Sequence, residues 1–310
     1  PHSYRERYFF SRTLSGQCHC MSDPSHPLSI GQCATLACLL EVITPKPGNV
    51  HRGADFEDLT LQDLVISASV IGAPMESAIS QGVGQAVLQA IQATRRVVAT
   101  NTNLGTILLV APLAAVPRHK SLTQGIGSVL AALTEQDSRD VYEAIRIARP
   151  GGMGQVEAMD IRESAPVDLL AAMRAASERD LVAKQYVCEF RTILEEVVPH
   201  LLDHHSLGWP LQQAIIHTQL HLLSRYPDSL ILRKCGQSTA DQAAGMATAV
   251  LQAGPPGSGE YEAALADFDF WLRADHHRRN PGTTADLIAA GLFAALRDDQ
   301  IRLAETPTAM

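Results

Sequence analysis

The chain has 310 residues, of which 46% are hydrophobic and 19% charged, and its formal net charge is −8. This composition is typical of a folded globular protein and excludes general disorder, while the negative charge disfavours nucleic acid or an anionic membrane as the main partner. No run reaches the ~20 apolar residues needed to cross a bilayer, no export signal is evident and six scattered cysteines form no disulfide framework, so we expect a cytoplasmic protein.

The sequence predicts an all-α fold, because segments rich in Ala, Leu, Gln, Arg and Glu alternate with clusters of Gly and Pro, and alternating β-branched runs are missing. We expect residues 1–27 to be an extension, 28–303 to form a single globular domain of roughly a dozen helices, and 304–310 to be a flexible tail. The predicted helices cover about residues 28–43, 61–71, 76–99, 104–116, 121–135, 138–148, 166–178, 180–203, 209–223, 238–252, 259–275 and 284–298.

Apolar residues in the predicted helix 180–203 recur at spacings of four and three residues, which is an a/d-type stripe. We interpret this stripe as core packing rather than as an oligomer seam. Apolar helix faces can close a monomer core or a homodimer, so the sequence leaves the oligomeric state open.

The loop over residues 44–60 is the first candidate site, because two prolines and two glycines give it a non-helical path and charges of both signs lie along it. Lys46 and Arg52 supply cations for a phosphate chain, whereas Asp55 and Asp58 could bind Mg²⁺ or accept a proton. The alternative is a solvated loop with incidental charges. The candidates here and in the preceding turn are Glu41, Lys46, Pro47, Gly48, Asn49, His51, Arg52, Asp55 and Asp58.

Three further segments have both a structural and a functional interpretation. Residues 101–105 and 280–286 each begin an apolar helix, where polar side chains either cap the helix or bind an anion or sugar. The glycines of residues 150–154 either form a turn or let the backbone approach a ligand. The candidates are Asn101, Thr102, Asn103, Gly105, Gly151, Gly152, Gly154, Gly282, Thr283, Thr284 and Asp286, and a ligand role for Asp286 requires that it face a cleft.

Basic residues near two other helix ends leave a similar choice. His217 is interpreted as a core histidine, and Arg233 with Lys234 either forms a rim for phosphates or a solvated helix end, the second being favoured slightly. The run His276–Arg279 is a charged corner or a donor group beside the following turn. Neither the P-loop pattern nor the Gly-x-Gly-x-x-Gly pattern is present, which disfavours the two common nucleotide-binding folds.

Five of these segments, in this order, resemble the triphosphoribosyl-dephospho-CoA synthase family over about residues 30–298. They are Glu41 with 45–50, 101–105, 150–154, Asp180 with 185–186, and 281–287. The resemblance implies a Mg²⁺-dependent transferase that moves the 5-triphosphoribosyl group of ATP onto the 2′-hydroxyl of 3′-dephospho-CoA. Adenine leaves, and the product is a prosthetic-group precursor.

The chain departs from the family pattern in three places. Asn103 stands where histidine is usual, only Asp58 remains of a His-Lys-Asp run, and Thr283-Thr284 replaces a second glycine. These departures keep alternatives open: a related ribosyl hydrolase, a transferase with another acceptor in one-carbon cofactor metabolism, or a non-catalytic nucleotide-binding protein.

The chemistry that the resemblance implies assigns hypothetical roles to the candidates. Asp55, Asp58 or Asp286 would supply the carboxylate and the Mg²⁺-binding oxygens, with Glu41 as a further acid or base and His51 as a proton carrier. The triphosphate would be held by Lys46, Arg52 and the turn 151–154, and the ribose or base by Asn49, Asn101 and Asn103.

Overall fold

The computed structural model describes residues 28–151 and 165–301. In these ranges the chain forms helices and no β-strand, which confirms the all-α prediction. The α-helices are α1 (Ile30–Ile43), α2 (Leu61–Val70), α3 (Gly72–Glu76), α4 (Ala78–Gln81), α5 (Val83–Val97), α6 (Leu104–Ala114), α7 (Leu122–Ala131), α8 (Glu135–Ala148), α9 (Leu169–Ala176), α10 (Leu181–Val187), α11 (Val198–Ser206), α12 (Leu211–Arg225), α13 (Ser229–Cys235), α14 (Gln237–Gln252), α15 (Gly259–Arg273) and α16 (Gly282–Arg297). A π-helical segment, η1 (Thr192–Val197), precedes α11.

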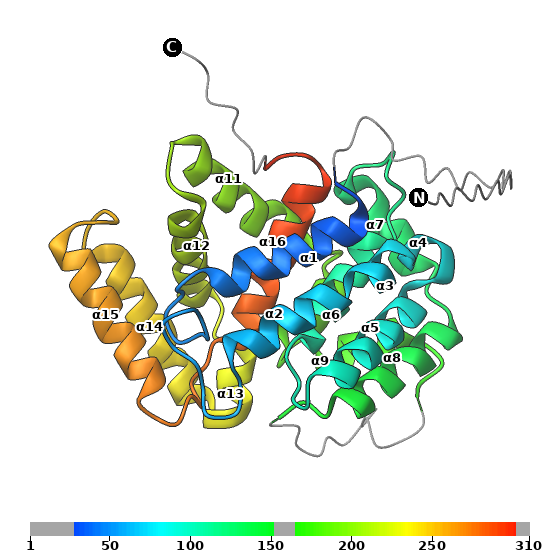
Figure 1. The fold of residues 1–310 in the computed structure, drawn as a ribbon, viewed down its shortest axis with the longest axis horizontal. Helices are drawn as coiled ribbons and strands as arrows, with labels where there is room; N and C mark the ends of the chain where they lie inside the picture. Colours follow the sequence, from blue (N-terminus) through cyan, green and yellow to red (C-terminus); the bar gives the residue numbers. More distant parts are fainter. Residues whose placement is uncertain (1–27, 152–164, 302–310) are drawn as a thin grey trace, which may run out of the picture.

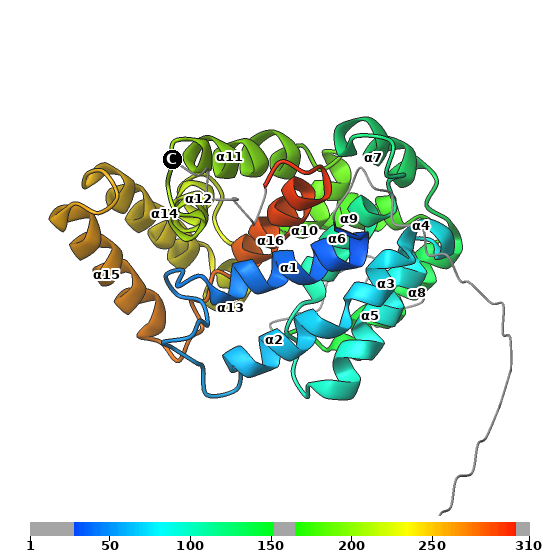
Figure 2. The same ribbon diagram turned by 45° about the horizontal axis from the view of Figure 1, so that its top comes forward.

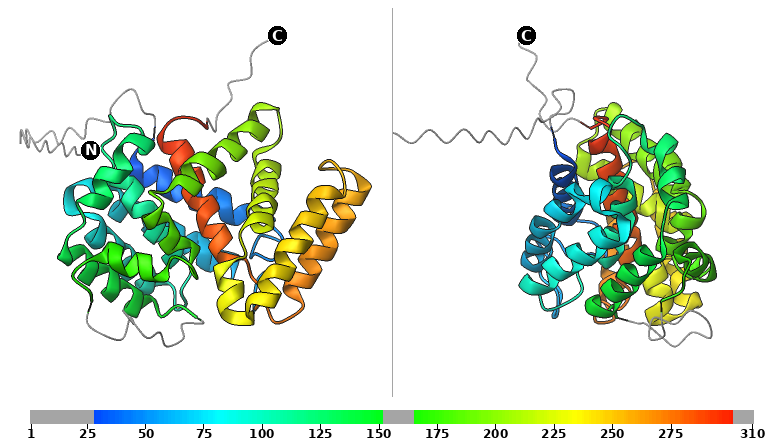
Figure 3. Two further views of the ribbon diagram at one scale, coloured as in Figure 1. Left: turned by 180° about the vertical axis from the view of Figure 1, so that it is seen from behind. Right: turned by 90° about the vertical axis from the view of Figure 1, so that its right-hand side faces the viewer.

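Two apolar helices, α6 and α16, form the centre of the main core. Nearly every residue of each is buried, because both sequences are apolar on all faces. Figures 1 and 3 show α16 passing through the middle of the molecule, between α12–α15 on one side and α5–α9 on the other. In the view of Figure 2, α1 lies along α16, and the two helices are in extensive contact.

A second, smaller core holds α12, α13, α14 and α15 together. Its buried residues include Leu220, Ile231, Ala243, Phe268 and Leu272. Within the described part of the chain, the helices are too short or too polar to meet the requirements of a membrane span.

Two predicted helices are divided in the structure. The segment 76–99 breaks at Gly82, whose φ of 90° is in the region that favours glycine. The segment 180–203 breaks after α10, where Glu189 and Phe190 adopt left-handed conformations. This turn buries Phe190 completely, while Val187, which the spacing of four and three residues places on the same apolar stripe, remains 43% exposed. The prediction of one continuous helix over residues 180–203 was therefore wrong.

Candidate functional site

A cavity of about 780 Å³ lies where the ends of several helices meet. Its walls come from residues 56–59, 100–108, 141–151, 169–183, 230–234 and 276–286. One wall is apolar and includes Leu108, Ile145, Met173 and Val182. The volume is of the size that accommodates a nucleotide-sized ligand.

The cavity brings together sequence-predicted residues from distant segments. Those that line it are Asp58, Asn101, Thr102, Asn103, Gly105, Gly151, Gly282, Thr283 and Asp286. Those that do not line it are Glu41, Lys46, Pro47, Gly48, Asn49, His51, Arg52, Asp55 and Thr284. Gly152 and Gly154 lie outside the described residues.

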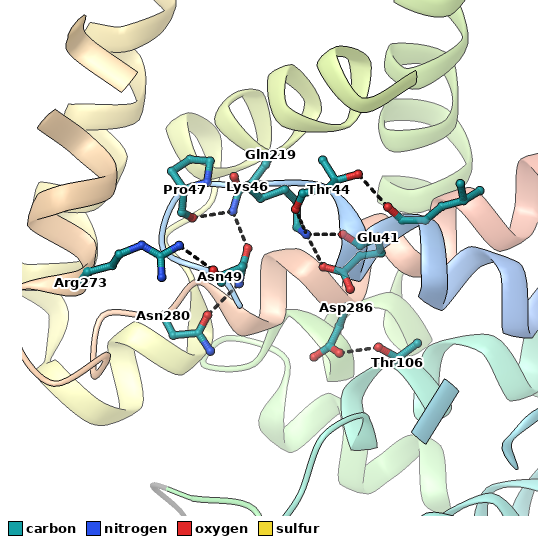
Figure 4. Close-up of polar contacts among 11 residues, drawn as sticks. Glu41, Thr44, Lys46, Pro47, Asn49, Thr106, Gln219, Arg273, Asn280 and Asp286 are labelled. Carbon is teal, nitrogen blue, oxygen red and sulfur yellow. Dashed lines mark hydrogen bonds and ion pairs between the residues drawn. The ribbon is translucent and has the colours of Figure 1, made fainter. Parts of the chain in front are cut away.

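Asp286 is the ionisable group of the cavity that is best suited to acid–base chemistry. It lies in the first turns of α16 and accepts a hydrogen bond of 2.6 Å from the Thr106 hydroxyl of α6 (Figure 4). Burial, assisted by the nearby carboxylates of Glu41 and Asp228, raises the pKa of Asp286 to about 7, although the Thr106 hydrogen bonds oppose this shift. A carboxyl group that titrates near neutrality can accept and return a proton at physiological pH.

Gly105 allows this carboxylate to lie against the start of α6. A Cβ atom at position 105 would lie 2.1 Å from Oδ2 of Asp286, so any larger residue would displace the carboxylate. The close approach of α6 and α16 therefore depends on glycine at this position.

The start of α16 is capped by Asp228 from outside the helix, and its own polar residues, Thr283 and Asp286 included, form no side-chain cap. The buried Asp228 carboxylate accepts hydrogen bonds from the Thr284 backbone at 2.7 Å and the Thr284 hydroxyl at 2.8 Å. The same carboxylate caps α13 by accepting from the backbone N–H groups of Leu230 and Ile231. The alternative that Asp286 caps its own helix is therefore wrong, and this leaves the Asp286 carboxylate available to the cavity.

Polar groups at the start of α6 also line the cavity, beside Asp286. Asn101 Oδ1 accepts a hydrogen bond from the Leu104 backbone, and the Thr102 hydroxyl pairs with that of Ser67. The amide nitrogen of buried Asn103 donates to Thr94 Oγ1 at 3.3 Å, and its Oδ1 has no partner among the described residues. A buried amide oxygen without a partner in a cavity wall is suited to a ligand hydroxyl or N–H group.

Cations surround the outer part of the cavity: Arg149, Arg179, Arg233 and Lys234 all line it. Arg233 is paired with Asp180 at 2.8 Å, whereas the Lys234 ammonium forms no ion pair with the described residues. Arg149 has a left-handed backbone, with φ of 49°, at the end of α8. We call Arg149, Arg179, Arg233 and Lys234 the cationic rim.

Arg233 and Lys234 were predicted from the sequence as a possible phosphate rim, whereas Arg149 and Arg179 were not. A signal for both was present, since Arg149 directly precedes the turn 150–154 and Arg179 directly precedes Asp180. Each therefore flanks a segment that carries the family resemblance.

Lys46 is fully buried behind the cavity instead of facing it. Its ammonium lies 2.7 Å from Oε1 of Glu41 and donates to the Glu41 carbonyl at 2.5 Å (Figure 4). The ammonium is thus engaged by the end of α1, only five residues earlier in the chain. Neither member of this ion pair lines the cavity.

The following residues of the loop are held by helices of the second core. Gly48 donates its N–H to Asp269 at 2.7 Å, and Gln219 Nε2 donates to Asn49 Oδ1 at 2.7 Å. Asn49 Nδ2 in turn donates to Asn280 Oδ1 at 2.7 Å, which connects the loop to the cavity wall (Figure 4). Gly48 has a φ of 75° and no room for a Cβ beside Leu272. Residues 47–49 thus connect α12, α15 and the cavity wall, and we call them the clamp.

The remaining candidates of the loop lie apart from the cavity. Asp55 is exposed and accepts the backbone N–H of Leu61 at 2.7 Å. His51 accepts the N–H of Gly53, and burial lowers the pKa of its imidazole. Arg52 is exposed. Within residues 28–151 and 165–301, carboxylates do not form a three-ligand metal cluster.

The fold and the cavity together define an all-α enzyme with a cationic, phosphate-compatible rim and a buried carboxyl group. The family model described as CitG, ATP:dephospho-CoA triphosphoribosyl transferase, matches residues 27–304, and the chain belongs to this family of transferases.

A solved structure supports the same relationship. A crystal structure from Archaeoglobus fulgidus, described provisionally as a triphosphoribosyl-dephospho-CoA synthase, is 25% identical in sequence and has a TM-score of 0.59. The match covers 75% of this chain and 97% of that one. No curated protein gives a significant match to the chain.

Proposed function

We propose that this protein transfers the 5-triphosphoribosyl group of ATP to the 2′-hydroxyl of 3′-dephospho-CoA, releases adenine and so makes a prosthetic-group precursor. The observation that carries this proposal is a single cavity that is lined both by Asp286 and by the cationic rim. The pKa of the Asp286 carboxyl group is raised to about 7. Family membership supports ATP and dephospho-CoA as the substrates.

In this reaction the 2′-oxygen of the acceptor bonds to C1 of the ATP ribose while the bond from C1 to adenine breaks. The acceptor loses its hydroxyl proton, and the departing adenine gains one. Asp286 in its ionised form accepts the hydroxyl proton, because its pKa near 7 keeps both protonation states accessible. Its negative charge also favours the oxocarbenium-like state that forms at C1.

The cationic rim is the proposed subsite for the triphosphate. Lys234 and the guanidinium groups of Arg149 and Arg179 offer charge-assisted hydrogen bonds, which the exposed Arg52 and the buried Lys46 do not offer to this cavity. Asn101 and the unpartnered Oδ1 of Asn103 are proposed to orient the ribose or the base.

Mg²⁺ is proposed to bind together with the triphosphate. Mg²⁺ sites commonly combine one or two protein carboxylates with substrate phosphates, so a preassembled cluster is not required. Asp58 lines the cavity and fits this role, whereas Asp55 does not line it. The ion would neutralise phosphate charge.

The Lys46–Glu41 pair is proposed to act through position. Glu41 is one of the carboxylates that raise the pKa of Asp286, and Lys46 limits that effect by pairing with it. Both residues therefore belong to the support of the site rather than to its substrate contacts.

Chromatographic detection of adenine from ATP and Mg²⁺, with and without 3′-dephospho-CoA, tests the proposal. We expect adenine and an equimolar triphosphoribosylated acceptor only when the acceptor is present. Lys234→Ala should reduce turnover at low ATP, while Arg174→Ala, an exposed change on α9 outside the cavity, should not. Adenine without acceptor would instead identify a hydrolase, and tight ATP binding without adenine would identify a non-catalytic protein.

A further inference from the structure

Four histidines gather between α11 and α12, on a surface that does not belong to the cavity. His200 and His204 are one helical turn apart on α11, and His217 and His221 are one turn apart on α12. Residues four apart lie on the same helix face, so each helix presents a pair of imidazoles to the other. Figure 1 shows the two helices as consecutive and adjacent.

The side chains of three of these histidines converge on one point. Single ring nitrogens of His200, His204 and His217 all lie within 4.8 Å of one another, and all three side chains are half-buried. The closest pair, His200 Nε2 and His217 Nδ1, is 3.0 Å apart. Three imidazole nitrogens bound to Zn²⁺ at 2.0–2.1 Å in tetrahedral geometry would be ~3.3 Å apart, so small side-chain rotations suffice.

Hydrogen bonding fixes the form of one of these rings. His204 Nδ1 lies 2.7 Å from the carbonyl of His200, so this nitrogen carries the proton and donates it. In the neutral imidazole, Nε2 of His204 then carries the lone pair that can bind a metal ion. A ring N–H bonded to a backbone carbonyl is the usual support of a metal-binding histidine, because it fixes both tautomer and ring orientation.

The convergence is not explained by hydrogen bonds within the cluster alone. The contact between His200 and His217 uses one N–H and one lone pair, and it leaves the lone pair of His204 without a donor from either ring. The ring of His204 is packed against Trp209 at a centroid distance of 4.5 Å, and that of His200 stacks on His221 at 4.3 Å. These contacts hold the imidazoles in place around the shared point.

We propose that His200, His204 and His217 form a binding site for a divalent transition-metal ion of the Zn²⁺ class. Imidazole nitrogens suit Zn²⁺, Ni²⁺ and Cu²⁺, whereas the hard ion Mg²⁺ prefers oxygen. Three protein ligands leave one coordination position, which water can fill. The site is separate from the ATP cavity, because none of the three ligands lines it.

Metal binding at this site would fasten α11 to α12. The expected effect reaches the loop of residues 47–49, because Gln219, two residues beyond His217, donates hydrogen bonds to Pro47 and Asn49. The metal ion is thus proposed to have a structural role: it would fix the position of α12, whose Gln219 holds residues 47 and 49.

The test uses the full chain, freed of metal with EDTA and titrated with Zn²⁺ against a chromophoric chelator. We expect one Zn²⁺ per chain, and at least about a tenfold loss of affinity in His204→Gln and in His217→Gln. The matched control is His205→Gln, which changes the adjacent histidine outside the trio and should retain wild-type affinity. Equal affinity in His204→Gln and His205→Gln would overturn the proposal, as would no binding at micromolar Zn²⁺.

A second measurement on the unmodified chain avoids dependence on variant folding. Co²⁺ bound to three imidazoles and water should give the visible absorption of a tetrahedral centre, and Zn²⁺ should displace it. Zn²⁺ should also raise the unfolding midpoint of the wild type, because an ion that binds only the folded state stabilises it. A Co²⁺ spectrum with sulfur-to-metal charge transfer would place the metal on cysteine and refute the assignment.

Discussion

Replacing Asp286 with asparagine tests two separate effects of its carboxyl group: the contribution to catalysis and the effect on the stability of the fold. Asparagine has nearly the same shape, and its amide oxygen can still accept the Thr106 hydroxyl that lies 2.6 Å from Oδ1. The variant cannot accept the proton of the acceptor hydroxyl. We expect kcat for adenine release to fall by about 10²–10⁴-fold, the usual contribution of a general base.

The same substitution should stabilise the fold above neutral pH. The pKa of Asp286 is raised from 3.8 to about 7, so the folded state binds its proton more tightly than the unfolded state. For this group, stability is greatest below pH 4, is lost as pH rises from about 4 to 7, and stays low above pH 7. The difference corresponds to ~4 kcal/mol, because each tenfold change in proton affinity is about 1.36 kcal/mol.

Asp286→Asn should therefore unfold at a higher temperature than the wild type at pH 8, by on the order of 10 °C, with little gain at pH 4. The wild-type kcat/KM should rise with pH toward a plateau above about 7, and this limb should be missing in the variant. Asp241→Asn, an exposed change on α14, serves as the control. The reasoning fails if Asp286→Asn keeps kcat within tenfold of the wild type, or if its stability at pH 8 is unchanged.

Three further changes test the support of the site. Gly105→Ala should cost about 1–3 kcal/mol of stability and at least tenfold in activity, because the new Cβ would collide with the Asp286 carboxylate. Gly245→Ala, with open space around it, should not destabilise the protein, and equal urea midpoints for the two variants would contradict this reasoning. Lys46→Met should lower the free energy of unfolding by ~3–5 kcal/mol, because it leaves the Glu41 carboxylate without its cation. Adding Glu41→Gln should recover part of this loss, which a double-mutant cycle checks. Lys234→Ala should raise KM for ATP and weaken its dependence on salt, and an unchanged salt dependence would exclude the ammonium from the triphosphate subsite.

The sequence predicted the fold class and most helices, since composition and helix-ending residues report local preferences directly. It did not predict the break in the segment 180–203. The apolar spacing continues through Val187 and Phe190, yet the chain turns between them and buries only Phe190. Periodicity describes which residues prefer the core, and it does not reveal whether the backbone reaches the core in one helix or two.

The candidate site, too, was predicted only in part from the sequence. Residues at helix starts, such as Asn103 and Asp286, line the cavity as expected, because helix ends and loops are where a helical scaffold exposes polar groups. Lys46 was expected to face a ligand, but its charge is satisfied by Glu41 five residues earlier. Spacing along the chain does not determine which of several nearby partners a charged side chain selects.

One consequence of the double cap by Asp228 concerns coordination between binding and chemistry. Its two oxygens join α13, which carries Lys234 in its last turn, to α16, which carries Asp286. Under the proposed function, this shared cap would keep the distance between the phosphate-binding Lys234 and the proton-accepting Asp286 nearly constant. We therefore expect a nucleotide with a shorter or longer phosphate chain to be a poorer substrate than ATP.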